Sequence, residues 1–230
     1  MVSTSDPTWF ERDPLELAPM LLGGVLRRAD ASGSVALRLT EVEAYRGSDD
    51  PGAHTFRGKT ARNATMFGPG GHVYCYFTYG MHHAVNIVAG PEGHGWGVLV
   101  RAGELVEGYE LAAERRHVRR STRIAGELAR GPGNVAQALG ATLVDDGATL
   151  ALRRDGAGDR DDLGDGLTAA DGVETVRWTF EPAALPPAHR TGPRVGVSGP
   201  GGDASAYPWR FWVPGEPSVS AYRPAVQRKR

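Results

Sequence analysis

The sequence predicts an α+β fold, a single mixed domain in which a curved antiparallel β-sheet is flanked by helices. Three observations lead to this prediction. Several segments alternate apolar and polar residues with a period of two, which is typical of half-buried strands. Other segments carry leucine and alanine at helical spacing after residues that begin helices. The 32 glycines and 16 prolines among 230 residues indicate many turns, which argues against an all-helical bundle.

The length of 230 residues suits one well-buried core, so we expect one domain over residues 1–230. Residues 153–172 are rich in Asp and Gly without periodicity, and we expect them to form a mobile surface loop. The first residues lack the pattern of a signal peptide, and no apolar run approaches the roughly 18 residues that a membrane span needs. We therefore expect a cytoplasmic protein that does not enter a membrane.

The first elements are predicted to be a short helix and a β-hairpin. Asp13 and Pro14 are residue types of an N-cap and a first helical turn, and leucines at helical spacing follow until a pair of glycines. Residues 25–30 and 34–45 then flank a turn at 31–33, and the second arm alternates cleanly.

The second arm of this hairpin contains two glutamates whose position needs an explanation. Regular alternation places Glu41 and Glu43 on the same face as the apolar residues Val35, Leu37 and Leu39. Glutamate is disfavoured inside strands, and a buried carboxylate is costly without a partner. Either one of the two has a chemical function, or both lie at the solvated end of the strand.

The remaining elements follow from the same two periodicities. Strands are predicted at 72–80, 83–90 and 97–103, and short strand-like runs at 194–198 and 209–213. Helices are predicted at 104–116, 122–130 and 134–140.

Three tyrosines gather in the segment 72–80. Tyr74 and Tyr76 share one face of the predicted strand, which suits a flat base held between rings. Tyr79 points the other way at a turn, which suits a side chain that wedges into a base stack. The alternative for all three is core packing with satisfied hydroxyl groups.

Cysteine and histidine usage argues against a metal site. Cys75 is the only cysteine, so neither an intramolecular disulfide nor a multi-thiolate zinc site can form. The histidines do not have the spacing of ligands on one helix, and His82 and His83 would point to opposite sides of an extended strand. We expect neither a metal ion nor a cofactor.

The net charge of −1 conceals an uneven distribution. Residues 141–174 hold nine acidic side chains and three arginines, a net of −6, which leaves +5 for the rest of the chain. Arg119 and Arg120 belong to a run of five arginines between positions 115 and 123, and clustered arginines neutralise nucleic-acid phosphates. The alternative interpretation is a solvated surface.

A second candidate phosphate contact precedes the predicted helix 134–140. Gly131 and Gly133 form a turn there, which exposes backbone N–H groups and the positive end of the helix dipole to an anion. An ordinary helix cap is the alternative.

Several motifs occur together and in order. They are TEVEAYRGSDDPGAHTFRGKTARNATMFGPGGHVYCYFTYGMHHAVNI, then GVLVRAGELVEG, ARGPGNVAQAL and RVGVS. Together they closely resemble the alkyladenine (3-methyladenine) DNA glycosylase family over nearly the whole chain, with the Asp-rich segment as the clear departure. The resemblance implies a monomer without cofactor that acts on double-stranded DNA containing damaged purines, associated with the nucleoid if its source is bacterial. It implies base flipping followed by hydrolysis of the N-glycosidic bond of an alkylated or deaminated purine.

The resemblance also implies roles for individual residues. Glu43 in the EAY motif matches the general base that activates water, and Arg101 in LVRA matches the arginine that helps to hold this carboxylate and the water. Tyr45, His54 and Tyr76 match the residues that enclose the extruded base.

Two further positions complete the match. Tyr79 matches the side chain that fills the gap left in the duplex, and Asn86 matches the asparagine that crowds the exocyclic amino group of guanine. Where relatives often carry a bulky aromatic residue after the YGM turn, this chain has His82 and His83. Lys59 is the only lysine in the cluster, so water rather than an amine is the expected nucleophile, and the enzyme is expected to be monofunctional.

Two other functions remain open at this point. One is a protein that binds lesions or abasic sites without turnover, against which Glu43 and Arg101 argue. The other is a hydrolase of free nucleosides, against which Tyr79 and the basic segment argue.

Overall fold

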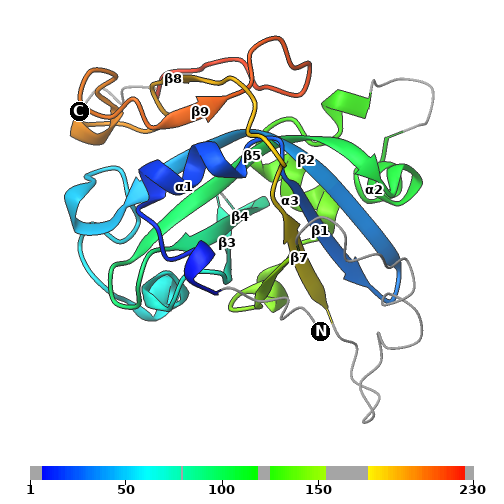
Figure 1. Ribbon diagram of the computed structural model, residues 1–230, viewed down its shortest axis with the longest axis horizontal. Helices are drawn as coiled ribbons and strands as arrows, with labels where there is room; N and C mark the ends of the chain where they lie inside the picture. Colours follow the sequence, from blue (N-terminus) through cyan, green and yellow to red (C-terminus); the bar gives the residue numbers. More distant parts are fainter. Residues whose placement is uncertain (1–6, 79, 119–124, 154–175, 226–230) are drawn as a thin grey trace.

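The structure is a computed structural model that describes residues 7–78, 80–118, 125–153 and 176–225. The predicted mobile loop, 153–172, lies outside these ranges except for its first residue. Three α-helices lie in the described ranges (Figure 1): α1 (Pro14–Leu21), α2 (Tyr109–Arg115) and α3 (Pro132–Leu139). Nine strands accompany them: β1 (Val25–Asp30), β2 (Gly33–Arg46), β3 (Val73–Thr78), β4 (His82–Ala89), β5 (Trp96–Glu107), β6 (Leu150–Leu152), β7 (Arg177–Glu181), β8 (Arg190–Gly192) and β9 (Arg210–Trp212).

Helix α1 begins where the sequence predicts it. The Asp13 carboxylate accepts a hydrogen bond of 2.9 Å from the backbone N–H of Leu15, which satisfies one of the free donors at the helix start. Leu17 and Leu21 are fully buried on the side that faces the sheet. The predicted hairpin is also confirmed, since β1 and β2 pair antiparallel around a tight turn.

The strands form one curved sheet (Figure 1). Its order is β3-β4-β5-β2-β1-β7-β6, and β9 pairs with both β2 and β8. All pairs are antiparallel except β6 and β7, which run parallel. The predicted α+β fold is thus confirmed, and the parallel pair adds a mixed edge. Parallel neighbours need a long connection, which the chain between Leu152 and Arg177 supplies.

Three irregularities occur in the pairing of β2 with β5, and two of them, in opposite directions, lie next to Glu41. Thr40 is an extra residue on β2, and Arg101 is an extra residue on β5. Each is a β-bulge, after which the side chains of the strand lie on the other face of the sheet. The core-facing residues of β2 accordingly change from odd-numbered to even-numbered positions. Before the bulge they are Val35, Leu37 and Leu39, and after it Val42 and Ala44. The prediction that Glu41 and Glu43 share the apolar face is therefore wrong, because the bulge turns them to the opposite face.

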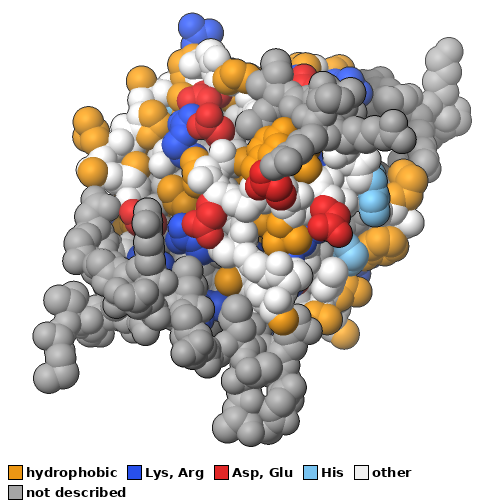
Figure 2. All heavy atoms as spheres, turned by 90° about the vertical axis from the view of Figure 1, so that its right-hand side faces the viewer, with side chains coloured by type: hydrophobic (Ala, Val, Ile, Leu, Met, Phe, Trp, Pro, Cys, Tyr) orange, Lys and Arg blue, Asp and Glu red, His pale blue; other side chains and the backbone are white. Residues whose placement is uncertain are grey.

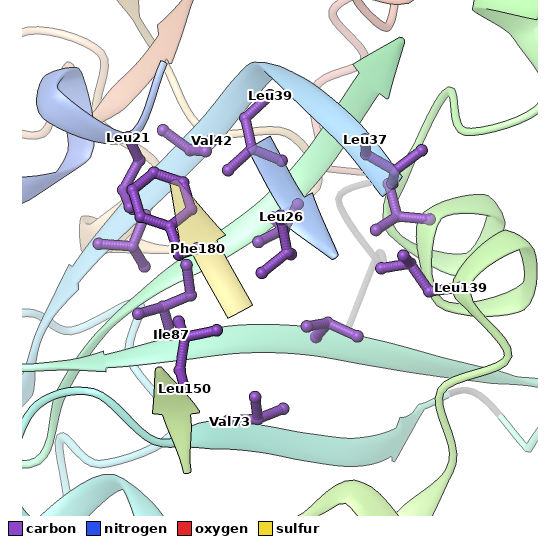
Figure 3. Packing of buried hydrophobic residues seen from close by; sticks show 14 of the residues in the cluster. Leu21, Leu26, Leu37, Leu39, Val42, Val73, Ile87, Leu139, Leu150 and Phe180 are labelled. Atoms are coloured by element: carbon purple, nitrogen blue, oxygen red, sulfur yellow. The ribbon is translucent and has the colours of Figure 1, made fainter. Parts of the chain in front are cut away.

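One hydrophobic core covers the inner face of the sheet (Figure 3). All three α-helices contribute to it, together with β1 to β7 and β9. The apolar side chains that meet there include Leu21, Leu26, Leu37, Leu39, Val42, Val73, Ile87, Leu139, Leu150 and Phe180. On β3, β4 and β5 the residues between these core positions point to the other face, which is where polar groups collect.

The predicted helix 104–116 differs from the structure in its first part. Residues 104–107 extend β5 instead, and the helix begins only at Tyr109. Gly108 separates the two elements with a φ of +74°, a conformation that favours glycine and turns the chain out of the strand. The apolar residues of this segment fit the period of a strand as well as that of a helix. The point where the strand ends and the helix begins therefore depends on pairing with β2.

Two other predicted segments also differ. Part of the predicted helix 122–130 lies outside the described residues, and Ala125–Glu127 form a short 3₁₀-helix rather than an α-helix. The run 194–198, predicted as a strand, is an irregular turn. The side chain of Arg194 donates to the carbonyl of Ala44 on β2. The backbone of the turn lies over the outer face of the sheet, where the N–H of Val195 donates to Glu43.

Charged side chains on the side that carries α2 are arranged in ion pairs. Figure 2 shows acidic and basic side chains close together on this face, between hydrophobic and uncharged groups. Arg115 of α2 contacts Asp30 at 2.9 Å, and Arg28 binds Asp145 at 2.8 Å. Asp145 is fully buried and also accepts a hydrogen bond of 2.8 Å from the indole of Trp178, so direct partners compensate its charge.

No helix in the described ranges combines the length and apolar character that crossing a membrane requires.

Leu39→Ala is expected to lower the free energy of unfolding by about 2–5 kcal/mol, because the truncation leaves a cavity in the core. Leu39 of β2 is fully buried in the hydrophobic core, whereas Leu185 is 84% exposed. The matched control Leu185→Ala is expected to change this free energy by less than about 0.5 kcal/mol. Urea denaturation of the two variants measures both values, and equal losses would contradict the assigned core.

Candidate active site

A cavity of about 340 Å³ lies on the outer face of the sheet. Alternate residues of β2, β3, β4 and β5 line it, because their neighbours along each strand face the core. A loop after β2, the start of α3 and the turn at 195–198 close the remaining sides. The lining residues are Glu43, Tyr45, Pro51, Gly52, His54, Met66, Tyr74, Tyr76, Thr78, Ala84, Asn86, Leu99, Arg101, Pro132, Val195, Gly196, Val197 and Ser198.

Three of these residues form a row across neighbouring strands. Glu43 on β2 pairs with Leu99 on β5, and Leu99 pairs with Asn86 on β4. Strand spacing places the Cα atoms of the outer two about 10 Å apart, with their side chains on the same face. Leu99 therefore forms an apolar floor between a carboxylate at one end of the cavity and an amide at the other.

Glu43 is fully buried, and its carboxylate has three neighbours that donate or carry positive charge. Oε2 accepts a hydrogen bond of 2.9 Å from the hydroxyl of Tyr45, and Oε1 accepts one of 2.7 Å from the backbone N–H of Val195. Nη1 of Arg101 lies 3.4 Å from Oε1. A carboxylate can accept about four hydrogen bonds, so Glu43 retains the capacity to accept one more.

The phenol of Tyr45 remains a hydrogen-bond donor to Glu43 over the physiological pH range. Burial raises its pKa well above the ordinary value, and the neighbouring Glu43 carboxylate raises it further. The guanidinium of Arg194 covers one face of the Tyr45 ring, at 4.5 Å from the ring centroid.

Arg101 is held by both glutamates of β2. Its Nε donates to Oε1 of Glu41 at 2.8 Å, which is closer than its approach to Glu43. Burial alone would lower the pKa of Arg101, but Glu43 and Glu41 together raise it, so the side chain stays charged. Arg101 thus brings a fixed positive charge to the cavity wall.

Arg194 is a buried residue that the sequence analysis did not select. It donates to both oxygens of Asp50 at 2.5 and 2.6 Å, to the carbonyl of Ala44 at 3.0 Å and to that of Gly201 at 2.9 Å. These bonds tie the turn at 195–198 to β2. Arg194 begins the RVGVS motif, but residue spacing does not reveal its role, because its partners are far away in the sequence.

The rings of two tyrosines stack along the cavity wall, and a histidine ring meets one of them edge-on. Tyr74 and Tyr76 are stacked with centroids 5.3 Å apart, which confirms that they share one face of β3. The ring of His54 meets Tyr76 edge-on at 4.6 Å. Burial and the nearby Arg62 lower the pKa of His54, so its imidazole is neutral at neutral pH.

The amide of Asn86 has a defined orientation. Its Nδ2 donates to the backbone carbonyl of Tyr74 at 3.1 Å. Because a carbonyl can only accept, the amide nitrogen must face Tyr74, and the Asn86 oxygen is left available to the cavity.

The predicted phosphate contacts are only partly described. Gly131 has a φ of +92°, and Pro132 at the start of α3 borders the cavity. Gly133 packs against His82 so closely that a Cβ there would lie 3.0 Å from the imidazole Cγ. The start of α3 therefore lies beside the start of β4 and the cavity. Tyr79, Arg119 and Arg120 lie outside the described residues.

Arg194→Met is expected to lower the free energy of unfolding by about 3–5 kcal/mol, because it leaves the buried Asp50 carboxylate without its cation. The double variant Arg194→Met/Asp50→Asn is expected to lose less than the sum of the two single changes. Urea denaturation of all four proteins measures the coupling, and strict additivity would contradict a direct ion pair.

The comparisons with known proteins agree with the motifs. A family model described as methylpurine-DNA glycosylase (MPG) matches residues 8–217. A Streptomyces avermitilis protein is 45% identical over 100% of this chain and 99% of its own length. A Leifsonia xyli subsp. xyli protein is 48% identical over 93% of this chain and 90% of its own. Both are provisionally named 3-methyladenine DNA glycosylases. The chain therefore belongs to the methylpurine-DNA glycosylase family of base-excision repair enzymes.

Proposed function

We propose that this enzyme extrudes an alkylated or deaminated purine from double-stranded DNA into the cavity and hydrolyses its N-glycosidic bond, with Glu43 as the general base. The observation that carries the proposal is the Glu43 carboxylate, which borders the cavity, has three of its positions occupied and retains one for a water molecule.

In the proposed reaction, the C1′–N bond breaks and its electron pair leaves with the purine. Water attacks C1′ of the sugar, and one proton of the water passes to Glu43. A purine that already carries positive charge is a good leaving group, and a neutral one needs a proton or hydrogen bonds as it departs. Arg101 keeps a positive charge beside the Glu43 carboxylate. The Tyr45 hydroxyl and the Val195 N–H orient the two oxygens of this carboxylate.

Water is the proposed nucleophile because no lysine occurs among the described residues that line the cavity. The product is then an abasic site in an uncut strand. This is the monofunctional outcome, in contrast to strand cleavage through a Schiff base.

The aromatic wall is proposed to hold the extruded base. Tyr45 and Tyr76 offer ring faces for stacking, and neutral His54 offers both a ring edge and a polar nitrogen. Asn86, at the opposite end of the row from Glu43, is proposed to contact the base edge that is remote from the sugar.

The surface around the cavity mouth is proposed to contact DNA. We assign Tyr79 to the gap that the extruded base leaves, and the Gly131–Gly133 turn, Arg119 and Arg120 to backbone phosphates. His82, at the start of β4, lies close to Gly133 of this turn. A single chain suffices for this arrangement, and we propose that the enzyme acts as a monomer.

Glu43→Gln is expected to reduce the single-turnover rate of base release by at least about 10²-fold, since glutamine cannot take a proton from water. The fold should persist, because the Tyr45 hydroxyl can rotate to accept from the new amide while Val195 still donates to the oxygen. Excision from duplexes with defined lesions measures the rate, and gel shifts measure lesion binding, which should remain.

Glu104→Gln is the matched control, because Glu104 lies on β5 outside the cavity lining and forms a partly exposed ion pair with Arg38. It is expected to excise at the unchanged rate. Near-normal excision by Glu43→Gln would remove Glu43 from the reaction, and a loss of lesion binding would indicate a folding role.

Asn86→Ser is expected to raise excision of normal guanine relative to hypoxanthine, especially from mismatches, where extrusion is easier. Serine is shorter, so it enlarges the corner where the amino group of guanine would sit, whereas hypoxanthine has no group there. The measurement is the ratio of the two release rates in matched duplexes. If both rates fall together and the ratio stays constant, Asn86 only supports β4.

A further inference from the structure

We propose that Glu41 is a positioning residue for the reaction, which divides the charge of Arg101 between two carboxylates and so keeps Arg101 from closing on Glu43. This inference rests on the proposed function of Glu43. It concerns a second buried glutamate that does not border the cavity and that therefore has no direct contact with a substrate.

Four donors surround the carboxylate of Glu41. Its Oε1 accepts from Nε of Arg101 at 2.8 Å, from Nε of Arg210 at 2.7 Å and from the hydroxyl of Ser220 at 2.9 Å. Its Oε2 accepts from the backbone N–H of Ser220 at 2.7 Å. Because these donors hold the carboxylate and it does not border the cavity, Glu41 cannot replace Glu43 as a base.

Arg101 is oriented by the Glu41 carboxylate. The Nε–H bond to Glu41 and a contact of 3.3 Å from Nη2 to the Ser220 hydroxyl fix two sides of the guanidinium. Only Nη1 is directed to Glu43, at the longer distance of 3.4 Å. Without Glu41, the planar guanidinium is free to form the two-pronged contact that arginine prefers with a carboxylate, and this would occupy the position that water needs.

The cluster is balanced in charge. Two carboxylates, Glu41 and Glu43, face two guanidinium groups, Arg101 and Arg210, and all four side chains are almost inaccessible. The other groups that face Glu43 are the Tyr45 phenol and, across its ring, Arg194. In such a buried cluster, removal of one charge changes the electrostatic potential at Glu43, and the sign of the change depends on the charge removed.

This balance predicts opposite effects for two substitutions. Glu41→Gln removes a negative charge and leaves Arg101 to Glu43 alone, so the acidic limb of the excision rate against pH moves to lower pH. The plateau rate falls roughly tenfold, within the about 10²–10⁴ that a positioned base contributes, because a more tightly paired carboxylate is a weaker base. Arg210→Gln removes a positive charge and draws Arg101 toward Glu41, so the acidic limb moves to higher pH.

The experiment measures single-turnover excision against pH, with the lesion duplex that the unchanged enzyme excises fastest. Lesion binding by gel shift should be retained in both variants, since Glu41 and Arg210 lie outside the cavity lining. If Glu41→Gln does not fold, the direction in which Arg210→Gln moves the acidic limb of the excision rate tests the proposal alone.

Asp145→Asn is the matched control, because Asp145 is equally buried and is bound to Arg28 but lies outside the cavity lining. It should lose stability and keep both the plateau rate and the pH profile. Unmoved acidic limbs in the Glu41 and Arg210 variants, or limbs that move in the same direction, would overturn the positioning role. Absence of excision by the unchanged enzyme would instead overturn the proposed function.

Discussion

The pair of opposite bulges between β2 and β5 is the constraint on which the site depends. Regular pairing would direct Glu41 and Glu43 into the core, where Leu37 and Leu39 pack. Because Thr40 and Arg101 are extra residues on their strands, the same sheet presents apolar side chains to one face and Glu41 and Glu43 to the other. The irregularity therefore makes a buried carboxylate compatible with a continuous core.

Buried charge also has to be paired, and this requirement organises the C-terminal segment. Ser220 and Arg210 satisfy Glu41, and Arg194 satisfies Asp50 from the turn that also caps Glu43 through Val195. Each of these residues lies more than a hundred positions from its partner. The segment after β7 thus completes the site by neutralising and orienting charges that β2 supplies.

The sequence predicts what depends on local periodicity. Helix α1, the first hairpin and the shared face of Tyr74 and Tyr76 all follow from residue spacing. The bulges do not follow from spacing, because an extra residue is recognisable only against the partner strand. For the same reason, the roles of Arg194 and Glu41 were not predictable, since each depends on partners that only the tertiary structure brings close.

The orientation of the Asn86 amide limits how this end of the cavity can select a base. Its nitrogen is bound to Tyr74, so the oxygen, a hydrogen-bond acceptor, is the polar atom offered to a ligand. An acceptor does not repel an amino group by charge, so under the proposed role of Asn86 the exclusion of guanine comes from lack of space. The available space depends on how rigidly β3 and β4 hold Asn86 against Tyr74. The proposed selectivity at this position therefore depends on strand packing as much as on the side chain itself.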